Sequence, residues 1–331
     1  MEKTGLTLGK FAPFHKGHEY IISTALNEMD HVIVVLYNAS LVTEIPESIR
    51  AGWIKTIFPS VEIIIAEDGP QETGYTREII EMQNNFLIKL LRGRKINSFY
   101  SSENYGKHVA DALNCNNRIV DLKRNSYSIN GTKLRDNPVK YKEFVSKCVF
   151  DEIKPKYYFI GAPSTGKTTI SKYCAEYLNG AYCEEYGREY WFKNQREHRL
   201  TMLDLEIIAE EHTKSENEIF KYEYNLTFID TCVITTYAYA LYYYNEASEK
   251  LKNILKKSLY KYKNVFLCDE DIPFDDSWDR SGPNSRKVIQ NINKDLMKKF
   301  NLNFILLSGA LENRFKTVNN YISKENEHFQ Y

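Results

Sequence analysis

The sequence carries no net charge, because its 331 residues include 44 Lys plus Arg and 44 Asp plus Glu. Proteins that mainly coat nucleic acid are usually distinctly basic, so this balance argues against that class while allowing local basic pockets. Long apolar runs are missing as well, and none approaches the roughly 18 residues typical of a membrane-spanning helix. We therefore expect neither a nucleic acid nor a membrane as a partner.

The chain also lacks any cysteine pattern that indicates a metal site or a disulfide framework. None of its six cysteines forms a Cys-x-x-Cys pair or a ligand cluster, so we interpret them as reduced thiols of a cytosolic protein. The first residues, Met1 to Gly5, do not resemble a signal peptide. We expect a cytoplasmic protein, and the sequence does not decide whether it forms a homo-oligomer.

Apolar runs alternate with amphipathic stretches along the whole chain, which is typical of α/β domains with mainly parallel sheets. The length suits two domains, which we place at residues 1–150 and 151–331. They are joined near Val149–Pro155, because a proline disfavours helix just before it. We expect strands at 5–9, 31–37, 61–66, 98–101, 118–120, 156–160, 226–230, 263–268 and 303–307, and helices at 17–28, 47–57, 76–92, 104–113, 167–178, 201–221, 232–245, 285–299 and 310–325.

Residues 161–169 form a complete G-x-x-x-x-G-K-[ST] phosphate-binding loop between a predicted strand and a predicted helix. Backbone N–H groups of such a loop surround a triphosphate, and the helix N-terminus adds partial positive charge. We expect Lys167 to reach the β- and γ-phosphates and the Thr168 hydroxyl to ligate Mg²⁺. The expected ATP-binding residues are Gly161, Ala162, Pro163, Ser164, Thr165, Gly166, Lys167, Thr168 and Thr169.

A second phosphate site is predicted near the N-terminus, where Gly9-Lys-Phe-Ala-Pro-Phe-His-Lys-Gly-His18 joins the first strand to the first helix. His15 and His18 lie at the start of that helix, and no side chain there is placed as a nucleophile. Histidines and a helix N-terminus aimed at one point favour in-line transfer, in which donors stabilise charge on a phosphorus transition state.

A basic segment, Ile129-Asn-Gly-Thr-Lys-Leu-Arg135, lies at the far end of the same domain. Gly131 and Thr132 suit a turn and a helix cap, and Lys133 and Arg135 are both able to face a polyphosphate. Alone, the segment is better explained as a solvated basic helix start. Paired with the histidine motif, it predicts part of an ATP site.

Together these motifs resemble the nucleotidyltransferase superfamily that carries H-x-G-H and I-S-x-T-x-x-R. More narrowly, the whole chain resembles the bifunctional NadR family, in which a nicotinamide mononucleotide adenylyltransferase domain precedes a ribosylnicotinamide kinase domain. The resemblance covers nearly the full length and includes Tyr100–Gly106, Val120–Arg124, the phosphate-binding loop and Glu185–Tyr190. It implies a Rossmann-like nucleotidyltransferase domain followed by a P-loop kinase domain.

The resemblance also assigns roles in the first domain. His15 and His18 would bind the ATP phosphates, with His18 as the main stabiliser of the transition state, and Lys133 and Arg135 would hold the departing pyrophosphate. The full set would be Gly9, Lys10, Phe11, His15, His18, Thr132, Lys133 and Arg135 for ATP, and Ser102, Glu103 and Tyr105 near the base or ribose. Trp53 would stack on nicotinamide or, alternatively, belong to the core. Asn130 stands where the family usually has serine, and an amide there can still form a hydrogen bond.

In the second domain, Asp230 ends an apolar run and is expected to coordinate Mg²⁺, directly or through water. Family members commonly have Asp-Thr-Asp where this chain has Asp230-Thr-Cys232, so a second carboxylate is missing. Related nucleoside kinases place an acid at the position of Glu185, where it accepts the 5′-hydroxyl proton or holds the ribose. Arg188 would bind substrate or phosphate. The alternative for Glu185 and Arg188 is a surface ion pair.

The polar segment 269–286 follows a predicted strand and resembles the mobile lid of a P-loop kinase. Arg280 and Arg286 would then close over ATP and neutralise charge that develops during transfer. An ordinary surface loop is the alternative.

The resemblance implies an enzyme of NAD salvage. Its kinase half would use ATP and Mg²⁺ to phosphorylate nicotinamide riboside to nicotinamide mononucleotide (NMN), and its other half would transfer AMP from a second ATP to NMN, giving NAD and pyrophosphate.

One rival is a pantetheine-phosphate adenylyltransferase joined to a dephospho-coenzyme A kinase, a family that typically has Thr at the position of His15. Another is a regulatory protein that binds NAD and ATP without turnover, which intact His18, Lys167 and Thr168 disfavour. Repressors of the family carry an N-terminal helix-turn-helix module, and with eight residues before Gly9 we do not expect one here.

Overall fold

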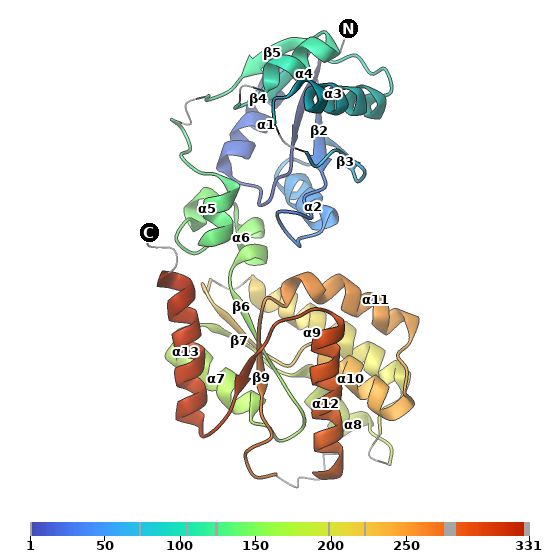
Figure 1. Cartoon of the computed structure of the whole chain (residues 1–331), viewed down its shortest axis with the longest axis vertical. Helices are drawn as coiled ribbons and strands as arrows, with labels where there is room; N and C mark the ends of the chain where they lie inside the picture. The colour runs from blue at the N-terminus through green and yellow to red at the C-terminus, as the bar shows by residue number, and fades with distance from the viewer. Residues whose placement is uncertain are drawn as a thin grey trace. The chain divides into compact units, whose positions relative to one another are not determined.

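The computed structural model describes residues 2–327 apart from residues 73, 104, 123–124, 198, 222 and 275–282. The chain divides into two compact units, Met1–Ile153 and Lys154–Tyr331. Each unit is an α/β domain built on its own five-stranded sheet (Figure 1). Neighbouring strands within the described residues pair in parallel, as the alternation of apolar and amphipathic segments predicts.

The sheet of the first unit has the strand order β3–β2–β1–β4–β5. Its strands are β1 (Thr4–Gly9), β2 (His31–Tyr37), β3 (Glu62–Ala66), β4 (Ser98–Ser101) and β5 (Asn116–Ile119). Its helices are α1 (Lys16–Glu28), α2 (Glu47–Ile57), α3 (Arg77–Leu91), α4 (Gly106–Leu113), α5 (Gly131–Asp136) and α6 (Lys147–Ile153), with a 3₁₀ turn at Lys142–Phe144.

The central strands of this sheet are buried on both faces. Val32, Val34 and Leu36 of β2 pack with α1, α2 and α6, whereas Ile33 and Val35 pack with α3 and α4 on the opposite face. Successive side chains of a strand alternate between the faces, so covering both faces requires an unbroken apolar run. This explains why β2 reads as a continuous hydrophobic segment.

The sheet of the second unit has the strand order β10–β9–β6–β8–β7. Its strands are β6 (Lys156–Ile160), β7 (Ala181–Cys183), β8 (Thr227–Asp230), β9 (Asn264–Cys268) and β10 (Ile305–Leu307). Helices α7 (Lys167–Tyr177) and α13 (Leu311–Glu327) cover one face, and α9 (Met202–Phe220), α10 (Val233–Tyr244) and α12 (Pro283–Lys299) cover the other (Figure 1). Helices α8 (Tyr186–Asn194) and α11 (Glu249–Ser258), and a 3₁₀ turn at Leu259–Lys261, complete the unit.

In both sheets the first strand of the unit lies at the centre, with later strands on either side of it. The chain therefore changes direction of winding next to β1 and next to β6, and such a switch point opens a crevice at the carboxyl ends of the strands. The histidine motif follows β1 and the phosphate-binding loop follows β6. The topology thus positions both motifs where α/β proteins bind ligands.

The segment between the two units is more ordered than the sequence predicts. The expected linker Val149–Pro155 is helical over most of its length, because α6 runs to Ile153 and buries Val149 in the core of the first unit. The helix ends two residues before Pro155, and the residue before a proline disfavours the helical conformation.

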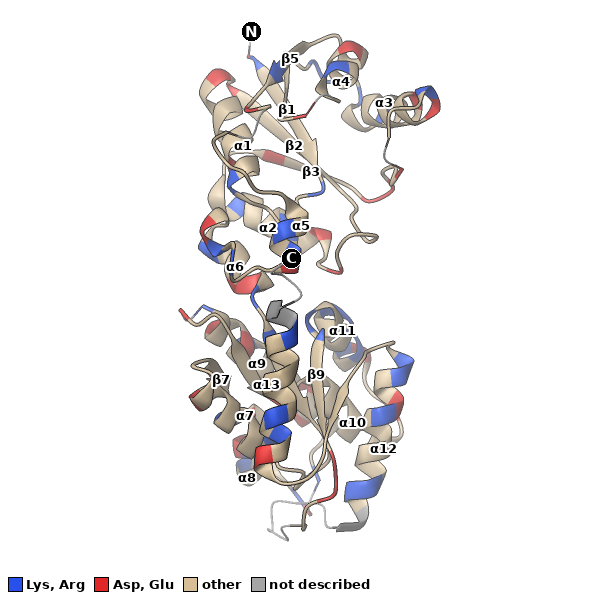
Figure 2. Ribbon diagram, turned by 60° about the vertical axis from the view of Figure 1, so that its left-hand side comes forward, with Lys and Arg blue, Asp and Glu red and all other residues tan. Residues whose placement is uncertain are grey.

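The described part of the chain has no helix that is both long enough and apolar enough to cross a membrane. Basic and acidic residues are interspersed along the helices of both units (Figure 2), in keeping with a net charge of zero.

Candidate active sites of the two units

The two histidines of the first motif meet at the start of α1. Their rings stack with centroids 3.7 Å apart, and the backbone N–H of His15 donates to Nδ1 of His18 over 3.3 Å. Gly17 lies between them, and a larger residue would be crowded at this position because its Cβ would lie 3.1 Å from the ring of His15. The spacing H-x-G-H therefore places both imidazoles at one helix N-terminus, as the sequence predicts.

Helix α5 brings the second basic segment against the loop of the first motif. Arg135 donates from Nη1 to the carbonyl oxygen of Ala12 over 2.5 Å, and a Cβ on Gly131 would lie 2.9 Å from that same oxygen. The side chain of Asn130 caps α5 by accepting the backbone N–H of Lys133 over 2.9 Å. Asparagine thus performs the capping that a serine at this position would perform.

Two pockets, of about 470 and 220 Å³, meet at this motif. The larger is lined by Tyr105 and His108, and the smaller by His15 and Arg135. The walls that both pockets share include His18 and four further residues, Lys10, Phe11, Ser102 and Glu103. His18 therefore lies between two binding spaces, which is the arrangement that transfer between two bound molecules requires.

Three residues expected at this site lie elsewhere. Trp53 is 4% exposed and packs in the hydrophobic core around α2, which corresponds to the core alternative considered for it. Thr132 and Lys133 are exposed and line neither of the two pockets. Because α5 turns only one face to the histidine loop, Arg135 lines the pocket and Lys133 points to solvent.

Sequence reasoning missed Arg50, which is 1% exposed. Its guanidinium donates to the carbonyl oxygens of Lys10, Tyr37 and Ile45 and pairs with Glu47. These contacts fix the loop that follows β1. An arginine within an amphipathic helix looks like a solvated residue, so the sequence offers no clear means of finding it.

The phosphate-binding loop of the second unit has the backbone that its glycines predict. Gly161 and Gly166 adopt φ values of 147° and 81°, which are accessible mainly to glycine. The Thr165 hydroxyl and Lys167 Nζ both donate to the carbonyl oxygen of Ala162, over 2.8 and 3.0 Å. The lysine thus lies over its own loop, at the place where phosphate is expected.

Four of the predicted kinase residues converge beside this loop. The Thr168 hydroxyl donates to Asp230 Oδ2 over 2.5 Å, and Arg188 Nη2 donates to Thr168 Oγ1 over 2.9 Å. Arg188 also lies 3.8 Å from a carboxylate oxygen of Glu185. The ion pair considered as the alternative for Glu185 and Arg188 is present, but both residues line a pocket beside the phosphate-binding loop.

Asp230 fits the role of a metal ligand. It is fully buried, and its Oδ1 has no hydrogen-bond partner within the described residues. Burial raises the pKa of this carboxyl to about 6, and the charge of Glu185 adds to the rise, so a cation beside it would be stabilising. One carboxylate and one hydroxyl, completed by phosphate oxygens and water, match what Mg²⁺ prefers.

Cys232 does not replace the missing second carboxylate. It is fully buried in the hydrophobic core of the second unit, and burial raises the pKa of its thiol to about 12. The described residues contain no group of three or more His, Cys, Asp or Glu side chains that could hold a metal by themselves. Asp230 and Thr168, the two residues expected at Mg²⁺, are in contact with each other beside the loop.

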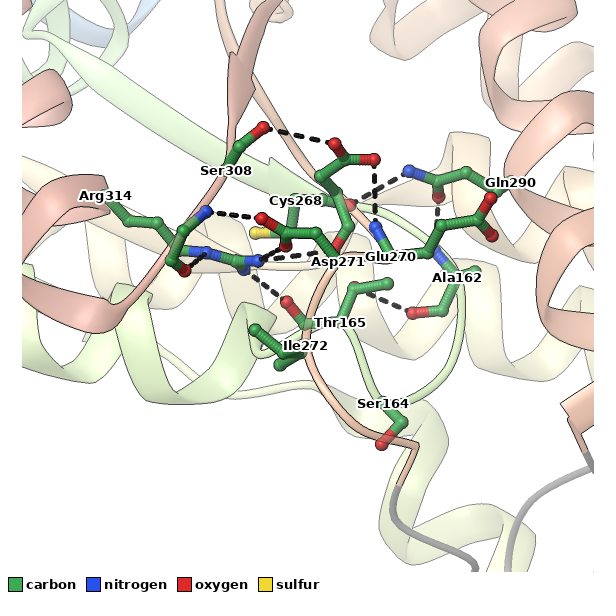
Figure 3. A network of polar contacts seen from close by, with 12 residues as sticks. Ala162, Ser164, Thr165, Cys268, Glu270, Asp271, Ile272, Gln290, Ser308 and Arg314 are labelled. Atoms are coloured by element: carbon green, nitrogen blue, oxygen red, sulfur yellow. Dashed lines mark hydrogen bonds and ion pairs between the residues drawn. The ribbon is translucent and has the colours of Figure 1, made fainter.

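The back of the phosphate-binding loop is held by a polar network that sequence reasoning missed (Figure 3). Arg314 of α13 donates to the carbonyl oxygen of Thr165 and to Asp271 Oδ1, each over 2.5 Å. Gln290 of α12 accepts the N–H of Ala162 and donates to the carbonyl oxygen of Cys268, each over 2.9 Å. Two C-terminal helices therefore fix the loop to the end of β9.

Of the two arginines expected in a lid, Arg280 lies outside the described residues. Arg286 is 8% exposed, and its terminal nitrogens donate to the carbonyl oxygens of Ile272 and Ser164 over 2.9 and 3.1 Å. In this structure Arg286 thus joins the network behind the phosphate-binding loop, because its guanidinium is engaged with backbone oxygens.

A pocket of about 90 Å³ opens beside the phosphate-binding loop. Lys167, Glu185 and Arg188 lie along its wall, and Trp191 and His212 contribute from α8 and α9. Since the predicted phosphate and acid residues line one side, the remaining space is suited to the group that receives phosphate.

Comparison with known proteins places these sites in a family context. A protein-family model described as an AAA domain matches residues 156–314. The chain is 27% identical to the trifunctional NAD biosynthesis/regulator protein NadR of Escherichia coli K12, with 91% of this chain and 78% of that protein covered. The NadR protein of Salmonella typhimurium LT2 is 26% identical, with 92% and 79% covered.

Two solved structures resemble the whole chain. A NadR protein in complex with NAD and AMP-PNP has a TM-score of 0.63 at 18% identity, and a NadR protein in complex with NR has a TM-score of 0.64 at 19% identity. Each match covers 98% of this chain and 97% of the other.

Fold and motifs together define the class of the molecule. It is an α/β protein with two mainly parallel sheets, in which a unit that carries the H-x-G-H motif precedes a P-loop kinase-like unit. Within that class the resemblance found in the sequence is confirmed, because the curated relatives and the solved structures that match nearly the whole chain are NadR proteins.

Proposed function

We propose that the protein is a bifunctional enzyme of NAD salvage. The second unit would phosphorylate nicotinamide riboside with ATP to give NMN. The first unit would transfer AMP from another ATP to NMN and release pyrophosphate. The observation that carries the proposal is that both motifs are intact and each lines a pocket of its own unit, with His18 between two pockets and Lys167 beside a third.

In the first unit, the phosphate of NMN would attack the α-phosphorus of ATP. A new phosphorus–oxygen bond forms to NMN as the bond to the β-phosphate oxygen breaks, and pyrophosphate leaves. His18, with His15 and the N-terminus of α1, would donate to the phosphoryl oxygens as negative charge develops. Arg135 lines the smaller pocket with them and would neutralise the departing pyrophosphate.

In the second unit, the 5′-hydroxyl of the riboside would attack the γ-phosphorus of ATP, and ADP would leave as the bond from that phosphorus to the β–γ bridging oxygen breaks. Glu185 would accept the hydroxyl proton, and Lys167 would neutralise charge on the β- and γ-phosphates. Asp230 and Thr168 would hold Mg²⁺, which supplies positive charge to the phosphates when it is bound. Arg188 bridges Glu185 and Thr168 and would orient both groups.

The direct test is incubation of the purified protein with ATP, Mg²⁺ and nicotinamide riboside, followed by mass spectrometry. We expect NMN first and NAD later, with one ADP for each NMN and one pyrophosphate for each NAD. Binding of ATP and NAD without any product would overturn the proposal in favour of a nucleotide-sensing regulator, a role included in the names of its curated relatives.

A further inference from the structure

The pocket beside Lys167, here termed the acceptor pocket, is lined by polar atoms that lack hydrogen bonds. Within the described residues, Trp191 Nε1, Thr231 Oγ1, Thr235 Oγ1 and both ring nitrogens of His212 are buried and have no hydrogen-bond partner. Native proteins leave few buried polar atoms unpaired, and each costs about 1–3 kcal/mol. Four such residues around one pocket indicate a ligand that supplies the missing partners.

His212, which lines the acceptor pocket, forms a buried pair with Glu216 on α9. His212 Nε2 lies 3.5 Å from Glu216 Oε1, and the two side chains are 3% and 1% exposed. Lys261 Nζ lies 3.8 Å from the other carboxylate oxygen of Glu216. A buried carboxylate attracts the N–H of a neighbouring imidazole, and the second ring nitrogen of that imidazole is then an acceptor.

The walls around this pair suit a flat ring. Trp191 of α8 and Tyr239 and Tyr243 of α10 supply aromatic surface, and Leu205 and Ile208 of α9 supply aliphatic surface. Helices α9 and α10, which carry most of these residues, pack against each other (Figure 1). Aromatic faces attract a cationic ring such as a pyridinium.

On the basis of the kinase reaction proposed above, we propose that His212 and Glu216 select the acceptor nucleoside by its ring substituent. His212 accepts a hydrogen bond from an amide N–H of the substituent, and the carboxylate of Glu216 orients His212. A carboxylate at the same ring position has no N–H to donate to His212. The pocket therefore prefers a pyridine riboside with a carboxamide to one with a carboxylic acid.

The test compares kcat/KM of the kinase for nicotinamide riboside and nicotinic acid riboside. We expect His212→Leu to raise KM for nicotinamide riboside about 10- to 100-fold, while kcat and the KM for ATP change little. His212→Gln retains an acceptor and should recover most of the affinity. Glu216→Gln should shift the preference about tenfold towards the acid. The control is Glu211→Gln on the same helix, whose carboxylate is exposed and pairs with Lys214.

The outcomes separate this inference from the proposed reaction. If the unaltered enzyme phosphorylates nicotinamide riboside and neither His212→Leu nor Glu216→Gln changes the ratio of kcat/KM between the two ribosides, the role of the pair is wrong and the kinase function stands. If the unaltered enzyme phosphorylates neither riboside, the proposed function fails. Calorimetric titration of both ribosides then shows whether the acceptor pocket prefers the amide. Tighter binding of the amide supports the inference, and equal or absent binding overturns it.

Discussion

At the scale of single residues, Asp230 is the buried carboxylate of the second unit that most needs a positive charge beside it. A buried carboxylate with an unpaired oxygen and a pKa raised to about 6 by burial is poorly stabilised by protein groups alone. The nearest hydroxyl, that of Thr168, belongs to the phosphate-binding loop. Since Cys232 is buried in the core, we expect a metal bound in this unit to depend mainly on Asp230.

Asp230→Asn should lower kinase turnover about 10- to 100-fold and raise the Mg²⁺ concentration needed for half-maximal rate, because a charged ligand is lost. Kinase rates across a Mg²⁺ titration measure both effects. Asp295→Asn, an exposed aspartate of α12 in the same unit, is the matched control. Unchanged Mg²⁺ dependence in Asp230→Asn would remove this residue from the metal site.

Asn130 illustrates how a departure from a family pattern can preserve its physical role. Its side chain caps α5, so Asn130→Ser should leave adenylyl transfer nearly unchanged. Asn130→Ala should weaken the cap by about 1 kcal/mol and raise KM for ATP in that reaction. Amide hydrogen exchange within α5 and steady-state kinetics are the measurements. Equal kinetics for the serine and alanine variants would show that the cap does not support the site.

At the scale of elements, the carboxyl ends of the parallel strands explain why residues distant in sequence meet. The sequence predicted most strands and helices because sheets buried on both faces require apolar runs and their helices are amphipathic. It missed β7 and α8, since the three-residue strand is too short to show a period and α8 is mixed in polarity. Helix α11 was missed despite its Ser248 cap and its buried Leu251 and Leu255.

The candidate sites were less predictable than the fold. Motif residues such as His18, Lys167 and Asp230 are recognisable because their chemistry requires fixed residue types at fixed spacing. Arg50 and Arg314 act through contacts with segments far away along the chain, whereas His212 lines a pocket that several helices form together. No local pattern distinguishes these three residues from surface residues.

The network behind the phosphate-binding loop gives a prediction at this scale. Arg314→Ala removes four hydrogen-bonding contacts of a side chain that is 3% exposed. We expect the free energy of unfolding of the second unit to fall by roughly 2–4 kcal/mol and the KM for ATP in the kinase reaction to rise. Denaturant unfolding and kinase kinetics are the measurements.

Lys316→Ala is the control for Arg314→Ala, because Lys316 is an exposed residue of the same helix. If both variants retained normal stability and a normal KM for ATP, the network of Figure 3 would have no part in holding the loop.

At the scale of the whole molecule, the chain joins two α/β units, each with its own switch point and its own pockets. Each site is lined entirely by residues of one unit in the described chain. The proposed reactions share an intermediate, since NMN is the product of one and the substrate of the other. They do not share any residue, so each should survive the loss of the other.

The independence of the two sites is tested most directly with the His18→Ala and Lys167→Ala variants. Each variant is incubated with ATP, Mg²⁺ and either nicotinamide riboside or NMN, and the NMN, NAD and pyrophosphate formed are quantified. His18→Ala should phosphorylate the riboside normally but make NAD about 10²- to 10³-fold more slowly, because a donor to the transition state is lost. Lys167→Ala should convert NMN to NAD normally and leave the riboside unphosphorylated. Loss of both activities in either folded variant, or normal NAD formation by His18→Ala, would contradict two independent sites built on these motifs.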